Sequence, residues 1–148
     1  MGLDVVAFKN AKPSTDEYST HVYSVTGCEN RLDGKTEGTY DGEDKFHFRA
    51  GSYGGYNEWR NWLSRKFLGV DPREVWDNKE KYTGKPFVEL IDFSDCEGAF
   101  GPVTSAKLAK DFQDNKDSVV DRSWNQARYE YWQRAFELAA QEGFVVLC

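Results

Sequence analysis

The two ends of this chain constrain its fold more than any other feature. Leu3–Phe8 near the start and Phe144–Leu147 near the end are short, apolar and rich in β-branched residues, which is typical of buried strands. Between them, apolar residues recur at helical spacing over residues 55–68, 103–112 and 123–142. This order predicts an α+β domain with a small, mostly antiparallel sheet packed against about three helices.

Length and composition limit the class of protein. A chain of 148 residues is expected to form one domain over residues 1–148, without disulfide or metal support. The formal net charge of -6 disfavours a bulk nucleic-acid binder, because such modules are usually basic. No apolar run approaches the ~20 residues of a membrane span, and Asp4 lies where a signal peptide carries positive charge. We therefore expect no membrane partner and a cytoplasmic location, in the host cytoplasm if the chain is viral.

Turn signals divide the rest of the chain. Tyr18–Val25 and Phe46–Arg49 have the composition of strands, and the glycine-rich residues 28–44 are expected to form a hairpin or mobile loop. Residues 77–86 are expected to form an exposed loop. Phe87–Phe93 is short and apolar enough for a strand, although a helical turn fits nearly as well.

Two helix ends and one ion pair are also predicted. Gly69 and Gly143 lie where glycine commonly ends a helix. Glu130 lies four residues before Arg134 in the last helix, which predicts a supporting ion pair between them.

A strand, a glycine-containing loop and a helix follow one another twice, at Phe46–Leu68 and at Phe87–Phe112. A helix that begins after such a loop presents unpaired backbone N–H groups and the positive end of its dipole, so it can hold an anion. Arg49 and Arg60 bring cations to the first junction, and Lys107 brings one to the second. Neither segment contains a known phosphate-binding pattern, and one junction alone is better explained by a capped helix after a tight turn. Their repetition favours ligand binding.

Aromatic side chains crowd around the first junction. Six rings lie within 17 residues, from Phe46 to Trp62, which is more than one buried face can hold. A flat ligand can stack on a ring for about 1–3 kcal/mol, and an adjacent arginine adds charge pairing. Rings, arginines and free amides together suit a nucleotide-like ligand, although the helical spacing of Trp59 assigns that residue to the core.

Catalytic and metal-binding patterns are weaker. Asp92, Asp95 and Glu97 could place oxygens around Mg²⁺ or Ca²⁺, but the EF-hand spacing is missing and turn acids commonly cap helices. The three cysteines form no CxxC pair. Ser52 lies in a rare form of the nucleophile-elbow pattern, but both histidines precede it, against the order that this hydrolase fold requires. The sequence therefore predicts no catalytic residue, no metal and no cofactor.

Two segments resemble a family of small, uncharacterised proteins of bacteria and their phages. They are FRAGSYGGYNEWR at residues 48–60 and FSDCEGAFGPVTSAKLAKDF at residues 93–112, and the resemblance extends to the opening GLDVVAF and the closing aromatic helix. The family has no assigned activity, so the resemblance implies no catalytic residue. It implies a context, because small phage proteins with nucleotide-sized pockets include sponges that sequester immune second messengers.

The leading hypothesis is non-enzymatic binding of a small anionic, nucleotide-derived ligand, in the manner of such a sponge. Arginines would pair with phosphate, tyrosines would stack, and the residues after each loop would donate hydrogen bonds. The predicted ligand-binding residues are Arg49, Ser52, Tyr53, Gly54, Gly55, Tyr56, Trp59, Arg60, Ser94, Asp95, Glu97, Ser105 and Lys107.

Two alternatives stay open. One is a phosphodiesterase-like or other nucleotide-processing enzyme that uses Asp92, Asp95 and Glu97. The other is a protein-interaction module whose exposed tyrosines and tryptophans contact a host protein. The sequence does not decide whether the chain forms a homo-oligomer.

Overall fold

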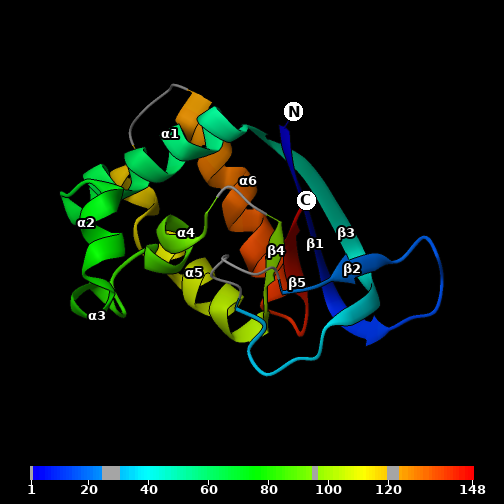
Figure 1. Ribbon diagram of the computed structural model, residues 1–148. Helices are drawn as coiled ribbons and strands as arrows, with labels where there is room; N and C mark the ends of the chain where they lie inside the picture. The colour runs from blue at the N-terminus through cyan, green and yellow to red at the C-terminus, as the bar shows by residue number, and fades with distance from the viewer. Residues whose placement is uncertain (1, 25–30, 95–96, 120–123) are drawn as a thin grey trace.

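The sheet is assembled around the N-terminal strand, as Figure 1 shows for a computed structural model that describes residues 2–24, 31–94, 97–119 and 124–148. The strands are β1 (Gly2–Pro13), β2 (Thr20–Val22), β3 (Gly38–Ser52), β4 (Gly98–Phe100) and β5 (Phe144–Leu147). Their order in the sheet is β2-β3-β1-β5-β4, and every neighbouring pair is antiparallel. The two predicted terminal strands are thus confirmed, and β1 and β5 are direct neighbours.

Helices cover one side of this sheet. The α-helices of the described residues are α1 (Tyr53–Leu63), α2 (Pro72–Asp77), α3 (Lys79–Tyr82), α4 (Val88–Asp92), α5 (Pro102–Asp114) and α6 (Trp124–Ala139). In Figure 1, α6 lies between the sheet and the other helices, and α5 packs beside it. The predicted α+β class is confirmed, but the six helices exceed the expected three, because α2, α3 and α4 are short pieces that the sequence pattern did not resolve. Among the described residues, no helix has the length and apolar character that a membrane span requires.

Several local predictions differ from the structure. Phe87–Phe93, for which a strand and a helical turn fitted nearly equally well, contains helix α4, and Phe87 precedes this helix in the left-handed conformation, with φ 62°. The run is apolar because it is buried on several sides, and period alone cannot separate a buried strand from a short buried helix. Strand β3 begins at Gly38, inside the predicted loop over residues 28–44.

Three more boundaries are corrected. The predicted loop over residues 77–86 contains the single turn of α3. Strand β4 occupies residues 98–100 of what the sequence indicated as a glycine loop. The expected strand Tyr18–Val25 is ordered as a strand only over Thr20–Val22 in the described residues.

The sheet buries side chains on both faces. Leu3, Val5 and Ala7 of β1 face the helices and join the main core with the rings of α1, α5 and α6. Phe8 and Phe144 lie in a second cluster on the other face, which exists because the sheet curls. Its other members are Val22, Tyr40, Ala99 and Val146.

Two bulges produce this curl in the β1–β3 ladder. Asn10 on β1 and Asp44 on β3 have positive φ values of 52° and 55°, and the register slips beside each of them. A bulge adds one unpaired residue to a strand and increases its twist. At Gly42 the ribbon is so tight that a Cβ would lie 2.2 Å from Cδ2 of Phe8, so only glycine fits. The bend carries the start of β3 over the second cluster.

Candidate functional site

The first predicted junction has no glycine loop. Strand β3 continues to Ser52, and Tyr53 begins α1. Ser52 caps the helix, because its Oγ accepts a hydrogen bond of 3.0 Å from the backbone N–H of Gly55. Gly54 and Gly55 therefore belong to the first helical turn. The cation that reaches this turn is Arg128 of α6, whose Nη1 donates to the Gly55 carbonyl at 3.1 Å and whose pKa is lowered by burial.

Two residues predicted to bind a ligand instead connect α1 to the end of α4. Arg60 is only 5% exposed, lies 5.1 Å from the ring centroids of both Tyr56 and Trp76, and donates from Nη1 to the Phe93 carbonyl at 2.8 Å. The hydroxyl of Tyr56 donates to the same carbonyl at 2.9 Å, and Tyr56 is fully buried. The expected phosphate contact of Arg60 and the expected stacking of Tyr56 are therefore corrected. Both side chains hold the fold together.

The other side chains of the first junction are divided between core and surface. Trp59 is 1% exposed and stacks on Trp62 at 5.3 Å between ring centroids, so it belongs to the core as its helical spacing predicts, and its place among the predicted ligand-binding residues is corrected. Tyr53 is 37% exposed. Arg49 is exposed and forms an ion pair with Asp4, with 3.1 Å between Nε and Oδ1. Only Arg49 and Tyr53 among the predicted cationic and stacking residues are therefore accessible to a ligand.

The second junction does hold an anion, but the anion belongs to the chain itself. The carboxylate of Asp33 accepts hydrogen bonds from the backbone N–H and from Oγ1 of Thr104, both at 2.8 Å, in the first turn of α5. A Cβ on Gly101 would lie 2.6 Å from Oδ2 of Asp33, so the glycine makes room for the carboxylate. The start of α5 therefore holds an anion, as a helix N-terminus can, and that anion is the side chain of a residue 71 positions away in the sequence.

The remaining predicted residues of the second junction are also engaged within the fold. Ser105 is completely buried, and Ser94 is half-buried beyond the end of α4. Lys107 lies between two carboxylates, with its Nζ 2.7 Å from Glu89 and 2.6 Å from Asp111. Burial raises the pKa of the Asp111 carboxyl, and its contact with Lys107 opposes that shift. Lys107 therefore pairs with two partly buried acids, and its role in closing a ligand pocket stays a prediction.

The predicted carboxylate set is not brought together in the described residues. Asp92 is 8% exposed and lies 3.4 Å from Nη2 of Arg31 and 3.3 Å from Nζ of Lys79. Glu97 is exposed and lines a different cleft, beside the ends of β4 and β5. Asp95 lies outside the described residues. Within the described part of the chain, no three His, Cys, Asp or Glu side chains are placed to hold a metal ion.

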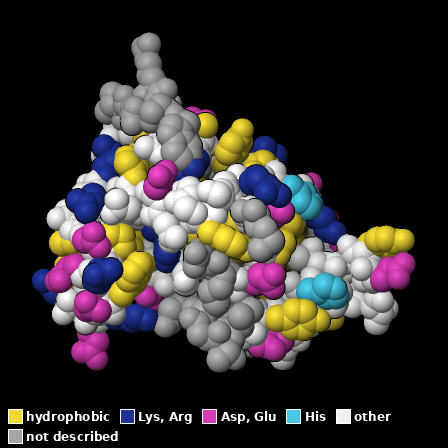
Figure 2. Space-filling model, turned by 45° about the horizontal axis from the view of Figure 1, so that its top comes forward, with side chains coloured by type: hydrophobic (Ala, Val, Ile, Leu, Met, Phe, Trp, Pro, Cys, Tyr) yellow, Lys and Arg dark blue, Asp and Glu magenta, His cyan; other side chains and the backbone are white. Residues whose placement is uncertain are grey.

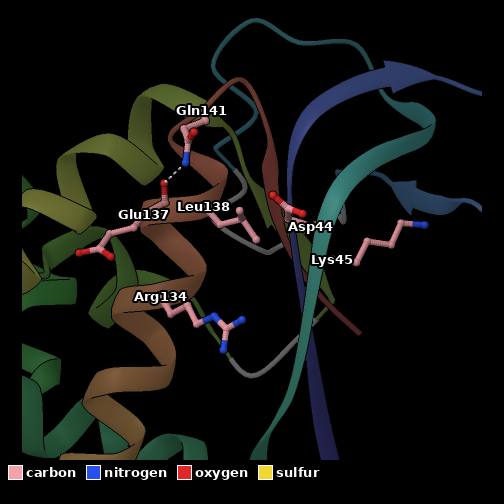
Figure 3. Close-up of a pocket in the computed structure, with 6 residues that line it drawn as sticks. All are labelled: Asp44, Lys45, Arg134, Glu137, Leu138 and Gln141. Atoms are coloured by element: carbon pink, nitrogen blue, oxygen red, sulfur yellow. Dashed lines mark hydrogen bonds between the residues drawn. The ribbon is translucent and has the colours of Figure 1, made fainter.

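An open groove lies elsewhere, between β3 and α6 (Figure 3). It has a volume of about 490 Å³, which is in the range of small-molecule sites. Arg134 and Leu138 extend from α6 toward β3, and Asp44 lies on the side of β3 that faces α6, whereas Lys45 points away. The groove is lined by Asp44, Lys45, Arg134, Glu137, Leu138 and Gln141.

Arg134 is the notable side chain of this β3–α6 groove. Its guanidinium carbon lies 4.2 Å from the centroid of the Phe46 ring, and it forms no hydrogen bond or ion pair with any described residue. The predicted ion pair with Glu130 is therefore wrong. The flat guanidinium gains more from lying on the ring of the facing strand than from an exposed pair, which stabilises by only about 0.3–0.5 kcal/mol.

A cluster of three rings supports this position of Arg134. Phe46 and Phe48 have centroids 5.6 Å apart, and Phe48 stacks on Tyr131 of α6 at 5.7 Å. Tyr131 precedes Arg134 by one helical turn, so both face β3. The sequence contained part of this signal, since Phe46 and Phe48 alternate in the strand, but nothing in it identified α6 as the facing element.

Asp44 stands across the groove from Arg134. It occupies the β-bulge, and its Oδ2 lies 3.1 Å from Nζ of Lys9 on the neighbouring strand. Its other carboxylate oxygen has no partner among the described residues. The side chain of Lys45, the next residue, points away from α6, and its Nζ lies 3.1 Å from Oδ1 of Asp41. The groove thus has a free cation on one wall, an acceptor on the other, and the apolar Leu138 between them.

Comparison with protein-family models, with curated proteins and with solved structures finds no match to this chain. The surface gives no simple functional signature either. On the face that Figure 2 shows, the coloured basic and acidic side chains are interspersed and do not form one continuous basic area. Function is therefore argued from the β3–α6 groove.

Proposed function

We propose that the β3–α6 groove binds a small anionic, nucleotide-derived ligand and releases it chemically unchanged. The observation that carries this proposal is the Arg134 guanidinium, which projects into the groove without a carboxylate partner among the described residues. Charged side chains at a protein surface usually find a counter-charge or remain in bulk water. Arg134 instead lies on a ring at the wall of a groove.

The ring contact prepares the guanidinium for an anion. Phe46 covers one flat face of Arg134, and this contact leaves the N–H groups around the guanidinium edge available. A phosphate can accept two parallel hydrogen bonds from that edge, and such charge-assisted bonds are about twice as strong as neutral ones. The aromatic support also limits the rotamers of Arg134, so less conformational entropy is lost when the ligand binds.

The rest of the groove suits the other half of a nucleotide. It is a slot between a helix and a strand, with Leu138 as an apolar contact for a flat ring. The volume of about 490 Å³ is sufficient for a mononucleotide-sized molecule. The same slot has the polar Gln141 at its rim, and this side chain can bond a sugar hydroxyl.

Binding without turnover is favoured by the residues that line the groove. They include no serine, cysteine or histidine, and of their two carboxylates Asp44 lies on the side of β3 that faces α6, whereas Glu137 points away from β3. A nucleophile or a matched acid–base pair is the usual requirement for hydrolysis of a phosphate ester. A protein that sequesters a nucleotide signal, which is the context that the family resemblance implies, has to bind the nucleotide and does not have to convert it.

A thermal-shift and calorimetric screen tests this proposal. Cyclic dinucleotides, cyclic ADP-ribose isomers and nucleoside monophosphates are added to the protein, and a ligand at 100 times its Kd adds about 2.7 kcal/mol of stability. Arg134→Ala is expected to weaken binding about 10- to 100-fold, because one charge-assisted contact is worth about 1.5–3 kcal/mol. Arg65→Ala is the matched control, since Arg65 is an exposed arginine that pairs with Asp71 at 3.1 Å outside the groove.

Two results would contradict the proposal. One is the absence of any shift with every nucleotide in the panel. The other is an equal loss of affinity in Arg134→Ala and Arg65→Ala, which would show a general effect of net charge. Ligand recovered from denatured protein is analysed by mass spectrometry, and recovery of a hydrolysed product would favour the enzyme alternative over simple binding.

A further inference from the structure

We infer that the β3–α6 groove selects nucleotides whose base carries adjacent N–H donors, with guanine as the best match. This inference rests on the proposed function, and it concerns the wall opposite Arg134. Asp44 lies there, on the side of β3 that faces α6 (Figure 3). A ligand whose phosphate binds Arg134 and whose ring crosses Leu138 presents the edge of that ring to Asp44.

The carboxylate of Asp44 is only partly used. Lys9 contacts Oδ2 at 3.1 Å, and the other oxygen has no partner among the described residues. The oxygens of a carboxylate are hydrogen-bond acceptors, so the unpaired oxygen of Asp44 can receive an N–H group of a ligand. A carboxylate accepts well from two neighbouring N–H groups, which guanine provides at N1 and at its exocyclic amino group. Uracil offers one N–H flanked by two carbonyl oxygens, and these would repel the carboxylate.

The backbone holds Asp44 in a defined position. Its φ of 55° places it in the left-handed region, where Asp and Asn are among the few residues with low cost. The adjacent Glu43 is hydrogen-bonded to Asn10 of the opposite bulge, so the two bulges are connected by side chains as well as by the ladder. The Asp44 side chain is 69% exposed, and its contact with Lys9 restrains it; a restrained acceptor distinguishes ligands better than a freely rotating one.

The wall residues also predict what the groove should reject. Base edges that lack one donor lose a hydrogen bond to a charged acceptor, and a good two-point contact to a base is worth about a tenfold discrimination or more. Hypoxanthine differs from guanine only by the missing amino group. The preference of the protein for guanosine monophosphate over inosine monophosphate therefore measures the contact with Asp44 directly.

Calorimetric titration with four probes tests the inference: guanosine, inosine, adenosine and uridine monophosphate. The wild-type protein is expected to bind the guanosine nucleotide at least about tenfold more tightly than the inosine and uridine nucleotides. Asp44→Asn should reduce this preference to less than about threefold, because an amide offers one donor and one acceptor. Asparagine also tolerates the left-handed backbone, so an unchanged Tm is expected.

Asp41→Asn is the matched control. It removes an acid from the same strand, but Asp41 pairs with Lys45 and does not line the groove. This control should bind all four probes like the wild-type protein. Equal binding of all four probes by the wild-type protein, with each weakened by Arg134→Ala, would overturn the inference and leave the proposed function standing. Loss of the preference in both Asp44→Asn and Asp41→Asn would also overturn it. Failure of every probe to bind would refute both.

Discussion

Replacement of Asp33 should show that the first turn of α5 is an anion site filled from within the chain. The carboxylate of Asp33 accepts two hydrogen bonds of 2.8 Å from Thr104, one from the backbone and one from the hydroxyl. Asp33 also has a φ of 56°, so alanine there would add backbone strain. Asp33→Gly removes the side chain without that strain, and Asp33→Asn removes only the charge.

The two substitutions are expected to differ in cost. Loss of a helix-capping side chain costs about 1 kcal/mol, and the Thr104 hydroxyl, in a side chain that is 9% exposed, loses its partner at a further cost of about 1 kcal/mol. Asp33→Gly should therefore lower the free energy of unfolding by about 2 kcal/mol. Asp33→Asn keeps one acceptor oxygen and loses mainly the interaction with the helix dipole, so about 1 kcal/mol is expected.

Urea denaturation followed by circular dichroism measures both losses. Asp44→Gly serves as the stability control, because Asp44 has nearly the same φ of 55° but forms only an exposed ion pair with Lys9. That control should lose no more than about 1 kcal/mol. If Asp33→Gly falls within about 0.5 kcal/mol of Asp44→Gly, the carboxylate of Asp33 does not hold α5 and the reasoning is refuted.

Two further predictions follow from buried and partly buried groups. Arg60→Met should lower the free energy of unfolding, measured by urea denaturation, by about 3 kcal/mol. The substitution leaves the Phe93 carbonyl without its guanidinium donor, at a residue that is only 5% exposed. A loss below about 1 kcal/mol would assign Arg60 a minor role. Cys148 is exposed, but desolvation of its thiol and the carboxylates of Asp4 and Glu97 raise the pKa of that thiol, so it should react slowly with iodoacetamide at neutral pH. The alkylation rate of Cys148 should begin to increase at a higher pH than the rate of a model peptide thiol. Peptide mapping by mass spectrometry measures both rates, and identical pH profiles would contradict the raised pKa.

Local patterns in the sequence were sufficient to predict the terminal strands and the three long helices. Period and composition placed the terminal strands and the three long helices, because a strand or an amphipathic helix is a local solution to burying one face. They did not decide between a strand and a helical turn for Phe87–Phe93, where most side chains are buried in a short helix. They also missed β4, whose three residues are all buried and too few to show a period.

The candidate groove does not lie where the sequence analysis expected a ligand site. The sequence indicated an anion at the start of a helix after a glycine loop, and α5 does hold one, supplied by Asp33. It indicated an arginine beside aromatic rings, and Arg134 lies on Phe46. The arginines chosen from sequence proximity, Arg49 and Arg60, are instead paired with Asp4 and buried against Phe93.

The sequence by itself determined the α+β class and the strand-forming character of both chain ends. It also determined which charged and aromatic side chains are present. The tertiary structure alone decided which of those groups meet. Asp33 reaches α5 across 71 positions, and Arg134 reaches Phe46 across the space between α6 and β3. The reason is physical: backbone propensity acts over a few residues, whereas the partner of a charged or aromatic side chain depends on how the sheet curls and which helix covers it. The bulges at Asn10 and Asp44 increase the twist of the strands, and Asp44 lines the groove.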